Sequence, residues 1–410
     1  MVGRRIVAIA GVIALAAACT GSPDGPSGAL RTLEPLPNSG AGNRLLVQMD
    51  DGSIVTVAPD GGARALLAPS RGVDVDVRQP AWSPDGHSVA WAEIELGDQG
   101  QESRVVTSRP DGSLRTEVPV QTGTFFLQWD PTSSRIAYLG SFRGAIGMGV
   151  AETGGERGPA ATLLGVGQPF YLSWSPRGDR LLIHVGDSTL ATLDLDLATL
   201  DLEGEPSQLA DHPGLFQAPA WLADGRFVYA AVDHGKQRLV VSQGGRKELV
   251  RFRGVIEFVV DPTGNRVAYR IDDGDGLGGV SVVDIASGRT RVATDVPTSA
   301  FEWTHDGRRL LLMTPEPGSD EPIHRWRVWD GRETTTIGPP FQPSPTFLSD
   351  YVPFFGQFAQ GMSLWSPDGR SFAYPGLIGD RAGIWVQDLE ADDPALVLKD
   401  GAVVAWSPVG

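Results

Sequence analysis

Few side chains in this sequence have the types and spacings that catalysis requires. No two of its six histidines are four residues apart and none begins an H-x-x-E pattern, so the sequence predicts no metal centre built on histidine. The pattern G-x-S-x-G, which marks the nucleophile of many serine hydrolases, is absent. We therefore expect a protein that binds rather than an enzyme. The histidines are His87, His184, His212, His234, His305 and His324.

One run of carboxylates has the composition of a cation site. Asp272, Asp273 and Asp275 alternate with glycines and offer several oxygen ligands on a flexible loop, as calcium loops do. The run lacks the EF-hand spacing and its closing glutamate, so we interpret it as part of a solvated acidic rim. We expect no cofactor, with a weakly bound calcium ion as the alternative. The other acids of the rim are Asp74, Asp76, Asp98, Glu102, Glu316, Asp320 and Glu321.

The composition excludes several classes of protein. The 410 residues include 50 acidic and 34 basic side chains, which gives a formal net charge of −16. This acidic balance argues against a nucleic-acid partner and against a body that rests on anionic lipid. A single cysteine excludes a disulfide framework and a cysteine-rich metal site. The length predicts either one large modular domain or several domains.

The N-terminal residues have the layout of a secretory signal. Arg4 and Arg5 precede an apolar run, Ile6 to Ala18, that is too short to span a bilayer comfortably. The run ends in Leu15-Ala16-Ala17-Ala18-Cys19, which resembles a bacterial lipobox, and this resemblance implies that Cys19 becomes the new N-terminus and carries lipid. An ordinary signal peptide followed by a chance cysteine is the alternative.

This N-terminal pattern predicts three segments. Residues 1–18 are the signal peptide, residues 19–42 are the lipidated cysteine and a flexible tether rich in Ser, Pro and Gly, and residues 43–410 are the folded body. We expect the protein at the extracytoplasmic face of the cell membrane, attached to it through the lipid anchor only.

A short pattern recurs eight times in the body, most fully as Ala81-Trp82-Ser83-Pro84-Asp85-Gly86. Its proline and glycine suit a type I turn that ends in a left-handed residue, and short β-prone runs follow it. Each unit therefore predicts about four strands, with the tryptophan packed between units and the aspartate bonded in the turn. The tryptophan positions, spaced by 47, 45, 47, 39, 43, 62 and 41 residues, are Trp82, Trp129, Trp174, Trp221, Val260 (a replacement), Trp303, Trp365 and Trp406.

Four-stranded units at this period are propeller blades. Residues 401–410 supply a first strand and part of its turn, and residues 43–67 supply the strands that should follow. The sequence therefore predicts an all-β β-propeller of eight four-stranded blades, one of them composite and closing the N-terminus onto the C-terminus. A ring in which the degenerate fifth unit is lost into a neighbour is the alternative. The Trp-Ser-Pro-Asp-Gly repeat is similar to that of TolB-like propellers, a WD-related class, and this resemblance implies the fold far more strongly than any function.

Strand order separates the two faces of such a ring. The Ser-Pro-Asp-Gly turns share one face, so irregular loops, the usual place for binding, fall on the opposite face. The largest irregular segment, Gly338 to Gly361, lies within the 62-residue interval. We interpret its aromatics as a partner-binding site, with packing between blades or over the propeller mouth as the alternative. They are Phe341, Phe347, Tyr351, Phe354, Phe355 and Phe358.

Two classes of function follow from these features. The first is a non-catalytic, monomeric lipoprotein whose propeller is a binding platform for an envelope protein or peptide. The second is an extracytoplasmic propeller enzyme, such as a cation-dependent lyase, or a small-ligand sensor. A lyase would need a cation and convergent His, Arg or carboxylate groups in the central channel, which a ring can gather from distant parts of the sequence.

Overall fold

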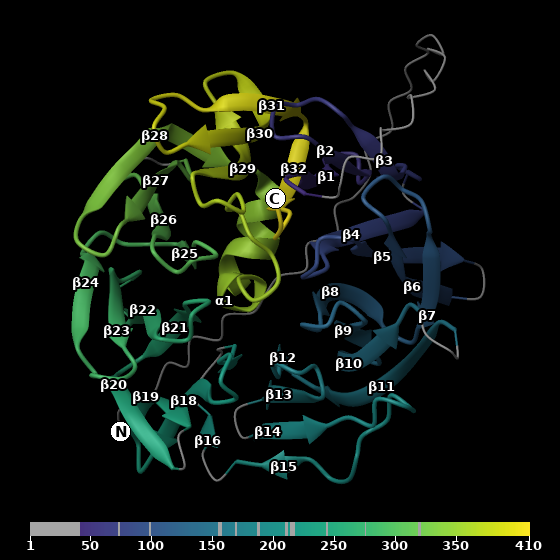
Figure 1. The fold of residues 1–410 in the computed structure, drawn as a ribbon, viewed down its shortest axis with the longest axis horizontal. Helices are drawn as coiled ribbons and strands as arrows, with labels where there is room; N and C mark the ends of the chain where they lie inside the picture. Colours follow the sequence, from purple (N-terminus) through teal and green to yellow (C-terminus); the bar gives the residue numbers. More distant parts are fainter. Residues whose placement is uncertain are drawn as a thin grey trace, which may run out of the picture. The chain divides into compact units, whose positions relative to one another are not determined.

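Strands account for nearly all the regular structure, and they are arranged in blades around a central channel (Figure 1). The computed structural model describes residues 42–410 except 73, 98–99, 155–157, 169, 187–188, 210–211, 214–217, 243–244, 275 and 319–320. Cys19 and the predicted tether up to residue 41 lie outside the described residues. Within the described part, no helix has the length and apolar character needed to cross a membrane.

Blades 1 to 3 are antiparallel sheets whose strands follow one another outward from the channel. Blade 1 comprises β4 (Val75–Trp82), β5 (Val89–Gly97), β6 (Gly100–Ser108) and β7 (Thr116–Val120). Blade 2 comprises β8 (Gly123–Trp129), β9 (Arg135–Phe142), β10 (Ala145–Glu152) and β11 (Ala160–Gly167). Blade 3 comprises β12 (Phe170–Trp174), β13 (Arg180–Val185), β14 (Thr189–Asp194) and β15 (Ser207–Gln208).

Blades 4 and 5 keep this plan, although two short strands share the inner position of blade 4. Both β16 (His212–Pro213) and β17 (Ala220–Trp221) pair with β18 (Phe227–Asp233), which β19 (Lys236–Ser242) and β20 (Arg246–Phe252) follow. Blade 5 comprises β21 (Val255–Val260), β22 (Arg266–Asp272), β23 (Val280–Asp284) and β24 (Thr290–Thr294). The unit in which Val260 replaces tryptophan is therefore a blade of its own.

Blades 6 and 7 are joined into one seven-stranded sheet by a long shared strand. Strand β28 (Thr334–Pro343) is the outer strand of blade 6, and its last residues then pair with β29 of blade 7 through Gln342 and Pro343. An isolated bridge from Trp365 to Phe372 continues the inner edge of blade 7. The other strands are β25 (Ala300–Trp303), β26 (Leu310–Pro315), β27 (His324–Trp329), β29 (Ser371–Ile378), β30 (Arg381–Asp388) and β31 (Ala395–Lys399).

The two ends of the described chain form the closing blade together. Its order from the channel outward is β32 (Gly401–Trp406), β1 (Leu45–Met49), β2 (Ile54–Val57) and β3 (Ala65–Ala68). Leu45 pairs with Trp406 and Val47 with Val404 in antiparallel register. The prediction of eight blades with one composite blade is confirmed.

The repeat motif holds turns and neighbouring blades together. In blade 1 the Asp85 carboxylate accepts hydrogen bonds from the Ser83 hydroxyl (2.6 Å) and the His87 main-chain N–H (2.9 Å), and Gly86 has a φ of 69° that favours glycine. In most units the repeat tryptophan donates its indole N–H to a main-chain carbonyl of the preceding blade. These bonds run from Trp82 to Ala405 (3.2 Å), Trp129 to Ala81 (3.3 Å), Trp174 to Gln128 (3.1 Å) and Trp303 to Val259 (3.1 Å).

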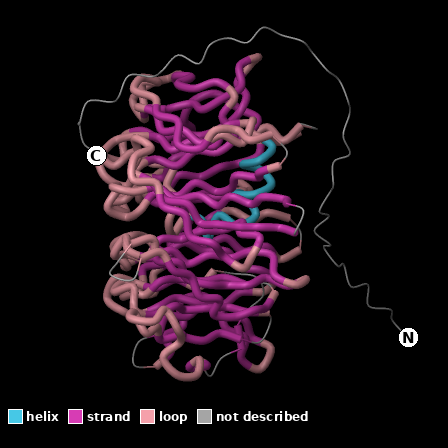
Figure 2. The backbone as a smooth tube through the Cα atoms, turned by 90° about the vertical axis from the view of Figure 1, so that its right-hand side faces the viewer, coloured by secondary structure: helices cyan, strands magenta, loops and turns pink. Residues whose placement is uncertain are grey.

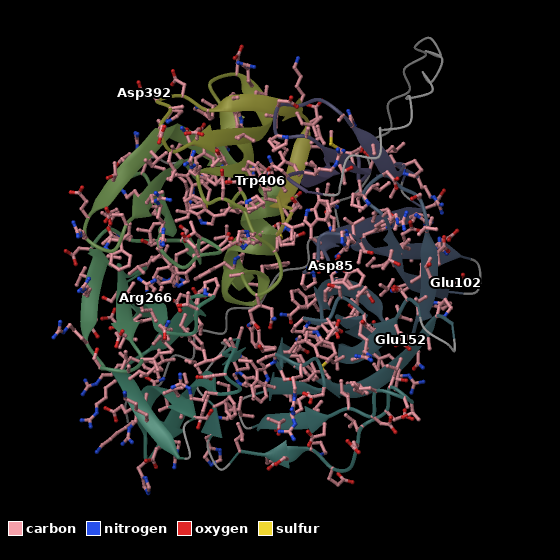
Figure 3. All side chains as sticks on the ribbon, in the orientation of Figure 1. Asp85, Glu102, Glu152, Arg266, Asp392 and Trp406 are labelled. Atoms are coloured by element: carbon pink, nitrogen blue, oxygen red, sulfur yellow. The ribbon has the colours of Figure 1, made fainter. Side chains whose placement is uncertain are left out.

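Side chains fill the spaces between neighbouring blades around the ring (Figure 3). Trp406, labelled there on β32, donates its indole N–H to the Asn43 side-chain oxygen at 2.9 Å. Apolar side chains of blades 1, 2, 3, 5, 6 and 7 and of the closing blade belong to one continuous buried cluster. Because this cluster also contains aromatics of residues 338–361, the irregular segment is part of the core.

Candidate functional site

Residues 344–361 lie across the middle of the ring (Figure 1), and we call residues 338–361, which begin with the end of β28, the channel segment. After β28 ends, the segment forms three short helical turns: η1 (Phe347–Tyr351), η2 (Val352–Phe354) and α1 (Phe355–Phe358). The Ser344 hydroxyl accepts a hydrogen bond from the Phe347 main-chain N–H at 3.2 Å, and Pro353 occupies the first turn of η2. In the edge-on view of Figure 2 these turns lie toward the face of the ring opposite the C-terminus.

Five of the six aromatics predicted to contact a partner are buried: Phe341, Phe347, Tyr351, Phe355 and Phe358. Phe347 stacks on Tyr351 with centroids 4.6 Å apart, and Tyr351 lies 5.2 Å from Phe358. These five rings pack in the channel or against its blades, as the alternative interpretation described. Phe354 is 47% exposed, and Tyr351, Phe354 and Phe358 line the cavity described below. Partner contact stays a prediction for all six residues.

Contacts to blades on several sides hold the channel segment in place. The Gln357 side-chain amide donates to the Leu172 carbonyl (2.8 Å) and accepts from the Leu172 N–H (2.9 Å), as a neighbouring strand would. The ring centroid of Phe358 lies 5.3 Å from that of Phe126 in blade 2. On the opposite side, the ring of Phe355 packs 4.6 Å from that of Phe301 in blade 6. The segment is therefore clamped between blades across the ring.

A cavity of about 340 Å³ remains between the channel segment, the closing blade and blades 1 to 3. Gln48 lines it near the end of β1 that lies away from the Ser-Pro-Asp-Gly turns, and its pairing partner Val403 of β32 lines it too, so the cavity lies toward the opposite face. Most of its wall is apolar. The aromatic lining residues are Phe125, Phe126, Phe170, Tyr171, Tyr351, Phe354 and Phe358.

Several polar groups of the cavity already have partners in the protein. The Gln79 side chain accepts from the Leu127 N–H (2.5 Å) and donates to its carbonyl (3.1 Å), and Arg78 forms an ion pair with Asp76. Burial, with a smaller contribution from nearby Glu257, raises the pKa of Tyr171 to about 12, so its hydroxyl is neutral at physiological pH. The cavity therefore suits an apolar group, with polar contacts available at its rim.

A buried carboxyl lies next to the end of the channel segment. Glu302 of β25 accepts hydrogen bonds from the Ser363 hydroxyl (2.6 Å) and the Leu364 main-chain N–H (3.2 Å). Burial raises the pKa of Glu302 to about 7, although both hydrogen bonds act in the opposite direction. Burial likewise raises the pKa of Tyr351 well above its usual value, and the charge of Glu302 adds to this effect.

Ser299 and His324 have the geometry that nucleophilic catalysis would use, but they lie away from the cavity. The Ser299 hydroxyl is 3.1 Å from His324 Nε2, and His324 Nδ1 is 2.9 Å from the Pro322 carbonyl. Both residues are buried, and neither lines the cavity. Burial lowers the pKa of His324, which keeps its ring neutral. The pair therefore explains how a buried histidine is satisfied, and it offers no access for a substrate.

The predicted acidic rim forms no metal site in the part of the chain that the structure describes. No group of three or more His, Cys, Asp or Glu side chains among the described residues could hold a metal ion. Asp275 lies outside these residues, so calcium binding by Asp272, Asp273 and Asp275 stays a prediction. Two further acids of the rim, Asp98 and Asp320, also lie outside them.

The blade residues that line the cavity were not predicted from the sequence, although the repeat carries a signal for them. Most of the blade residues that line the cavity stand three or four places before a repeat tryptophan. At this position an inner strand passes the channel on the face opposite the turns. These residues are Arg78 and Gln79 before Trp82, Phe125 and Phe126 before Trp129, Phe170 and Tyr171 before Trp174, Met362 before Trp365 and Val403 before Trp406.

Comparisons with known proteins bear on the fold. No protein-family model and no curated protein sequence matches the chain. The solved structure of dihydro-heme d1 dehydrogenase NirN in complex with DHE is similar with a TM-score of 0.58 and 16% identity, covering 93% of this chain and 79% of that one. TolB from Acinetobacter baumannii is similar with a TM-score of 0.39 and 17% identity, covering 82% and 83% of the two chains. An oligogalacturonate lyase in complex with manganese has a TM-score of 0.46 and 14% identity, covering 88% and 86%.

At these sequence identities the similarity shows a shared fold alone. The three proteins are named for different roles, so the comparison does not indicate one activity. Function has to be argued from the site of this chain and its own residues. The comparison with NirN and the pairing of the strands together establish the architecture. The chain is a β-propeller.

Proposed function

We propose that this protein is a lipid-anchored, extracytoplasmic binding protein without catalytic activity, whose propeller holds an apolar group of an envelope protein or peptide. The observation that carries this proposal is the aromatic cavity between the channel segment and blades 1 to 3. The anchor is Cys19, on the evidence of the sequence pattern around it.

The size and lining of the cavity support binding of one or two side chains. Its volume of about 340 Å³ is at the lower end of the range for ligand pockets, which are concave and mostly apolar with few polar groups. A buried aromatic side chain removes about 150–250 Å² from water. At about 25 cal/mol per Å², that burial is worth several kcal/mol, which suffices for a binding hot spot.

Exposed residues at the opening of the cavity support the proposal that the partner extends beyond the cavity itself. Phe354 of η2 lines the cavity and keeps 47% of its surface exposed. Ser349 and Asp350 of η1 and Arg78 of β4 are also exposed at the lining. An apolar centre with a polar, accessible edge is the usual anatomy of a protein-binding surface.

A small-ligand sensor is the second candidate, and the volume of the cavity favours it. A lyase gains less support, because among the described residues the cavity lining has a single carboxylate, Asp350, and a single cationic side chain, Arg78, which is paired with Asp76. Acid–base catalysis on a sugar acid would need more such groups converging on one point.

The proposal is tested by mild in-cell crosslinking and affinity capture of the full, lipidated chain. Phe354→Ala removes the exposed ring at the cavity mouth, and Leu114→Ala is a matched control because Leu114 is 68% exposed on a turn at the other face. We expect one defined envelope protein with wild type and with Leu114→Ala, and at least a fivefold loss with Phe354→Ala, as for a hot-spot residue worth about 1 kcal/mol or more. Equal capture by all three would contradict the proposal.

Thermal-shift measurements with small aromatic and acyl compounds test the second candidate. A shift with purified wild type that disappears in Phe354→Ala, together with no captured protein, would favour the small-ligand sensor.

A further inference from the structure

The channel segment borders a second, smaller space on the side of blades 3 to 5, which we call the side hollow. Its volume is about 20 Å³, and it shares Tyr171, Phe354 and Gln357 with the lining of the cavity. The two spaces are therefore neighbours, and one ligand can extend into both. The other residues that line the side hollow are Ala218, Glu257, Phe258, Pro353 and Gly356.

Glu257 reaches the side hollow because of its position in the repeat. It stands three places before Val260, the position that Tyr171 holds in the unit of blade 3. Seven of the eight residues at this position line either the cavity or the side hollow, so the position faces the channel. Glu257 is the one carboxylate among them. The eight are Gln79, Phe126, Tyr171, Ala218, Glu257, Ala300, Met362 and Val403.

The Glu257 carboxylate has one oxygen paired and one oxygen free. Its Oε2 accepts a hydrogen bond from Arg270 Nη2, and no described residue donates to its Oε1. The side chain of Glu257 is 25% exposed and that of Arg270 is 7% exposed. Arg270 also donates to the main-chain carbonyls of Thr298 and Ser299, and its guanidinium carbon lies 5.7 Å from the ring centroid of Phe355. The accessible member of this ion pair is therefore the acid.

The charges around Glu257 favour a cation in the side hollow. Burial raises the pKa of Glu257, Arg270 lowers it and Asp272 raises it, and the balance is a raised pKa. Arg270 therefore does not fully compensate the cost of burying this carboxylate. A positive charge at Oε1 would reduce that cost, whereas an anion would meet two carboxylates and a guanidinium that is already bonded.

The size of the side hollow distinguishes between cations. A volume of about 20 Å³ holds a group of about the size of one water molecule. The lysine ammonium is a compact point charge of that size at the end of a flexible four-carbon stem. The arginine guanidinium is a larger planar group, and the side hollow has no room for it.

We propose that the partner places a lysine ammonium in the side hollow, against Glu257, and a large apolar side chain in the neighbouring cavity. The inference rests on the proposed function, because it names the chemistry of the partner that the cavity holds. One extended peptide can supply both groups, since alternate side chains lie on the same side about 7 Å apart. The net charge of −16 favours a basic partner at long range as well.

Four peptides test the charge and the size of the bound group. Each is an acetylated and amidated Phe-Gly-X, in which X is lysine, norleucine, arginine or glutamate, and norleucine has an aliphatic stem without the ammonium. Isothermal titration calorimetry measures their binding to the purified, lipidated full-length protein in detergent. We expect the lysine peptide to bind at least fivefold more tightly than each of the others, as for a charge-assisted hydrogen bond.

Two glutamine variants test whether Glu257 is responsible. Glu257→Gln keeps an acceptor for Arg270 and removes the charge, so the preference for lysine over norleucine should fall below twofold while norleucine binding stays unchanged. Glu316→Gln is the matched control, because Glu316 is also ion-paired, with Arg325, is 29% exposed and lines neither space. This control should keep the preference of wild type.

The outcomes separate this inference from the proposed function. Equal binding of the lysine and norleucine peptides to wild type, or a lysine preference that persists in Glu257→Gln, would overturn the inference and leave the apolar site intact. Equal binding of the lysine and arginine peptides would overturn the assignment to lysine. The wild-type comparisons decide the matter even where Glu257→Gln fails to fold. Binding of none of the four peptides would overturn the proposed apolar site, and with it the inference.

Discussion

Replacing Glu302 with glutamine should stabilise the protein at pH 8 and change its stability little at pH 4.5. Glu302 is buried, and its partners are the Ser363 hydroxyl at 2.6 Å and the Leu364 N–H at 3.2 Å. Both partners donate, so the glutamine carbonyl can accept in place of the carboxyl oxygen. The substitution removes the buried charge and keeps the shape of the side chain.

The magnitude follows from the raised pKa. Glu302 has a pKa of about 7 in the folded protein, against 4.5 for an ordinary glutamate. Between these two pH values the folded state therefore binds more protons than the unfolded state. The contribution of Glu302 to the free energy of unfolding is fully present below pH 4.5 and is lost as the pH rises to about 7. One unit of difference between the folded and unfolded pKa is worth about 1.4 kcal/mol. The difference between 4.5 and about 7 therefore corresponds to a loss of about 3 kcal/mol, which changes little above pH 7.

Urea unfolding of wild type and Glu302→Gln from pH 4.5 to 8 measures this difference. The free-energy difference between the two proteins should grow across that range to about 3 kcal/mol in favour of the variant. Glu333→Gln, at an exposed turn residue, is the control and should stay within about 0.5 kcal/mol of wild type. Parallel curves for wild type and Glu302→Gln would refute the reasoning, since they would mean that the buried carboxyl titrates normally.

Three further substitutions test the channel segment and the anchor. Phe358→Ala removes the ring that packs 5.3 Å from Phe126 and should lower the free energy of unfolding by about 3–5 kcal/mol in urea; a loss below 1 kcal/mol would mean that the ring is not part of the core. Gln357→Leu leaves the N–H and carbonyl of Leu172 unpaired and should cost about 1–3 kcal/mol, whereas an unchanged midpoint would contradict the clamp. Cys19→Ala should move the protein from the membrane to the soluble fraction, and retention in the membrane would contradict the lipid anchor.

The blades could be predicted because the repeat is local. A proline, an aspartate and a glycine within four residues specify the turn, and the tryptophan beside them contacts the preceding blade. The composite blade followed from counting strands at the two ends, which the pairing of Leu45 with Trp406 confirms. Even the unit with Val260 kept its place, because the turn and not the tryptophan defines the blade.

The path between blades 6 and 7 could not be predicted. The interval of 62 residues indicated a long excursion there, but the double pairing of β28 depends on tertiary packing around Phe341, whose ring stacks 5.4 Å from Trp326. The helical turns of the channel segment are three to five residues long, too short for a helical hydrophobic period. Their aromatics are buried because the ring closes around them, and sequence spacing carries no information about that closure.

Part of the cavity wall could have been predicted from the sequence. Aligning the repeats on their tryptophans places Phe125-Phe126 and Phe170-Tyr171 at the same two positions, where blade 1 has Arg78-Gln79. Two adjacent aromatic pairs at one repeat position indicate a shared surface on the channel. The rest of the cavity wall, from the channel segment, required the structure.

Site-specific photocrosslinking tests the central claim, that the cavity is the binding site, most directly. A photoreactive phenylalanine analogue at position 354 reports on the cavity mouth, and the same analogue at position 114 reports on the exposed turn at the other face. Irradiated cells that make the lipidated protein should yield one defined envelope-protein adduct from position 354 and none from position 114. Adducts from position 114 alone, or the same set from both positions, would contradict the claim that the cavity holds the partner.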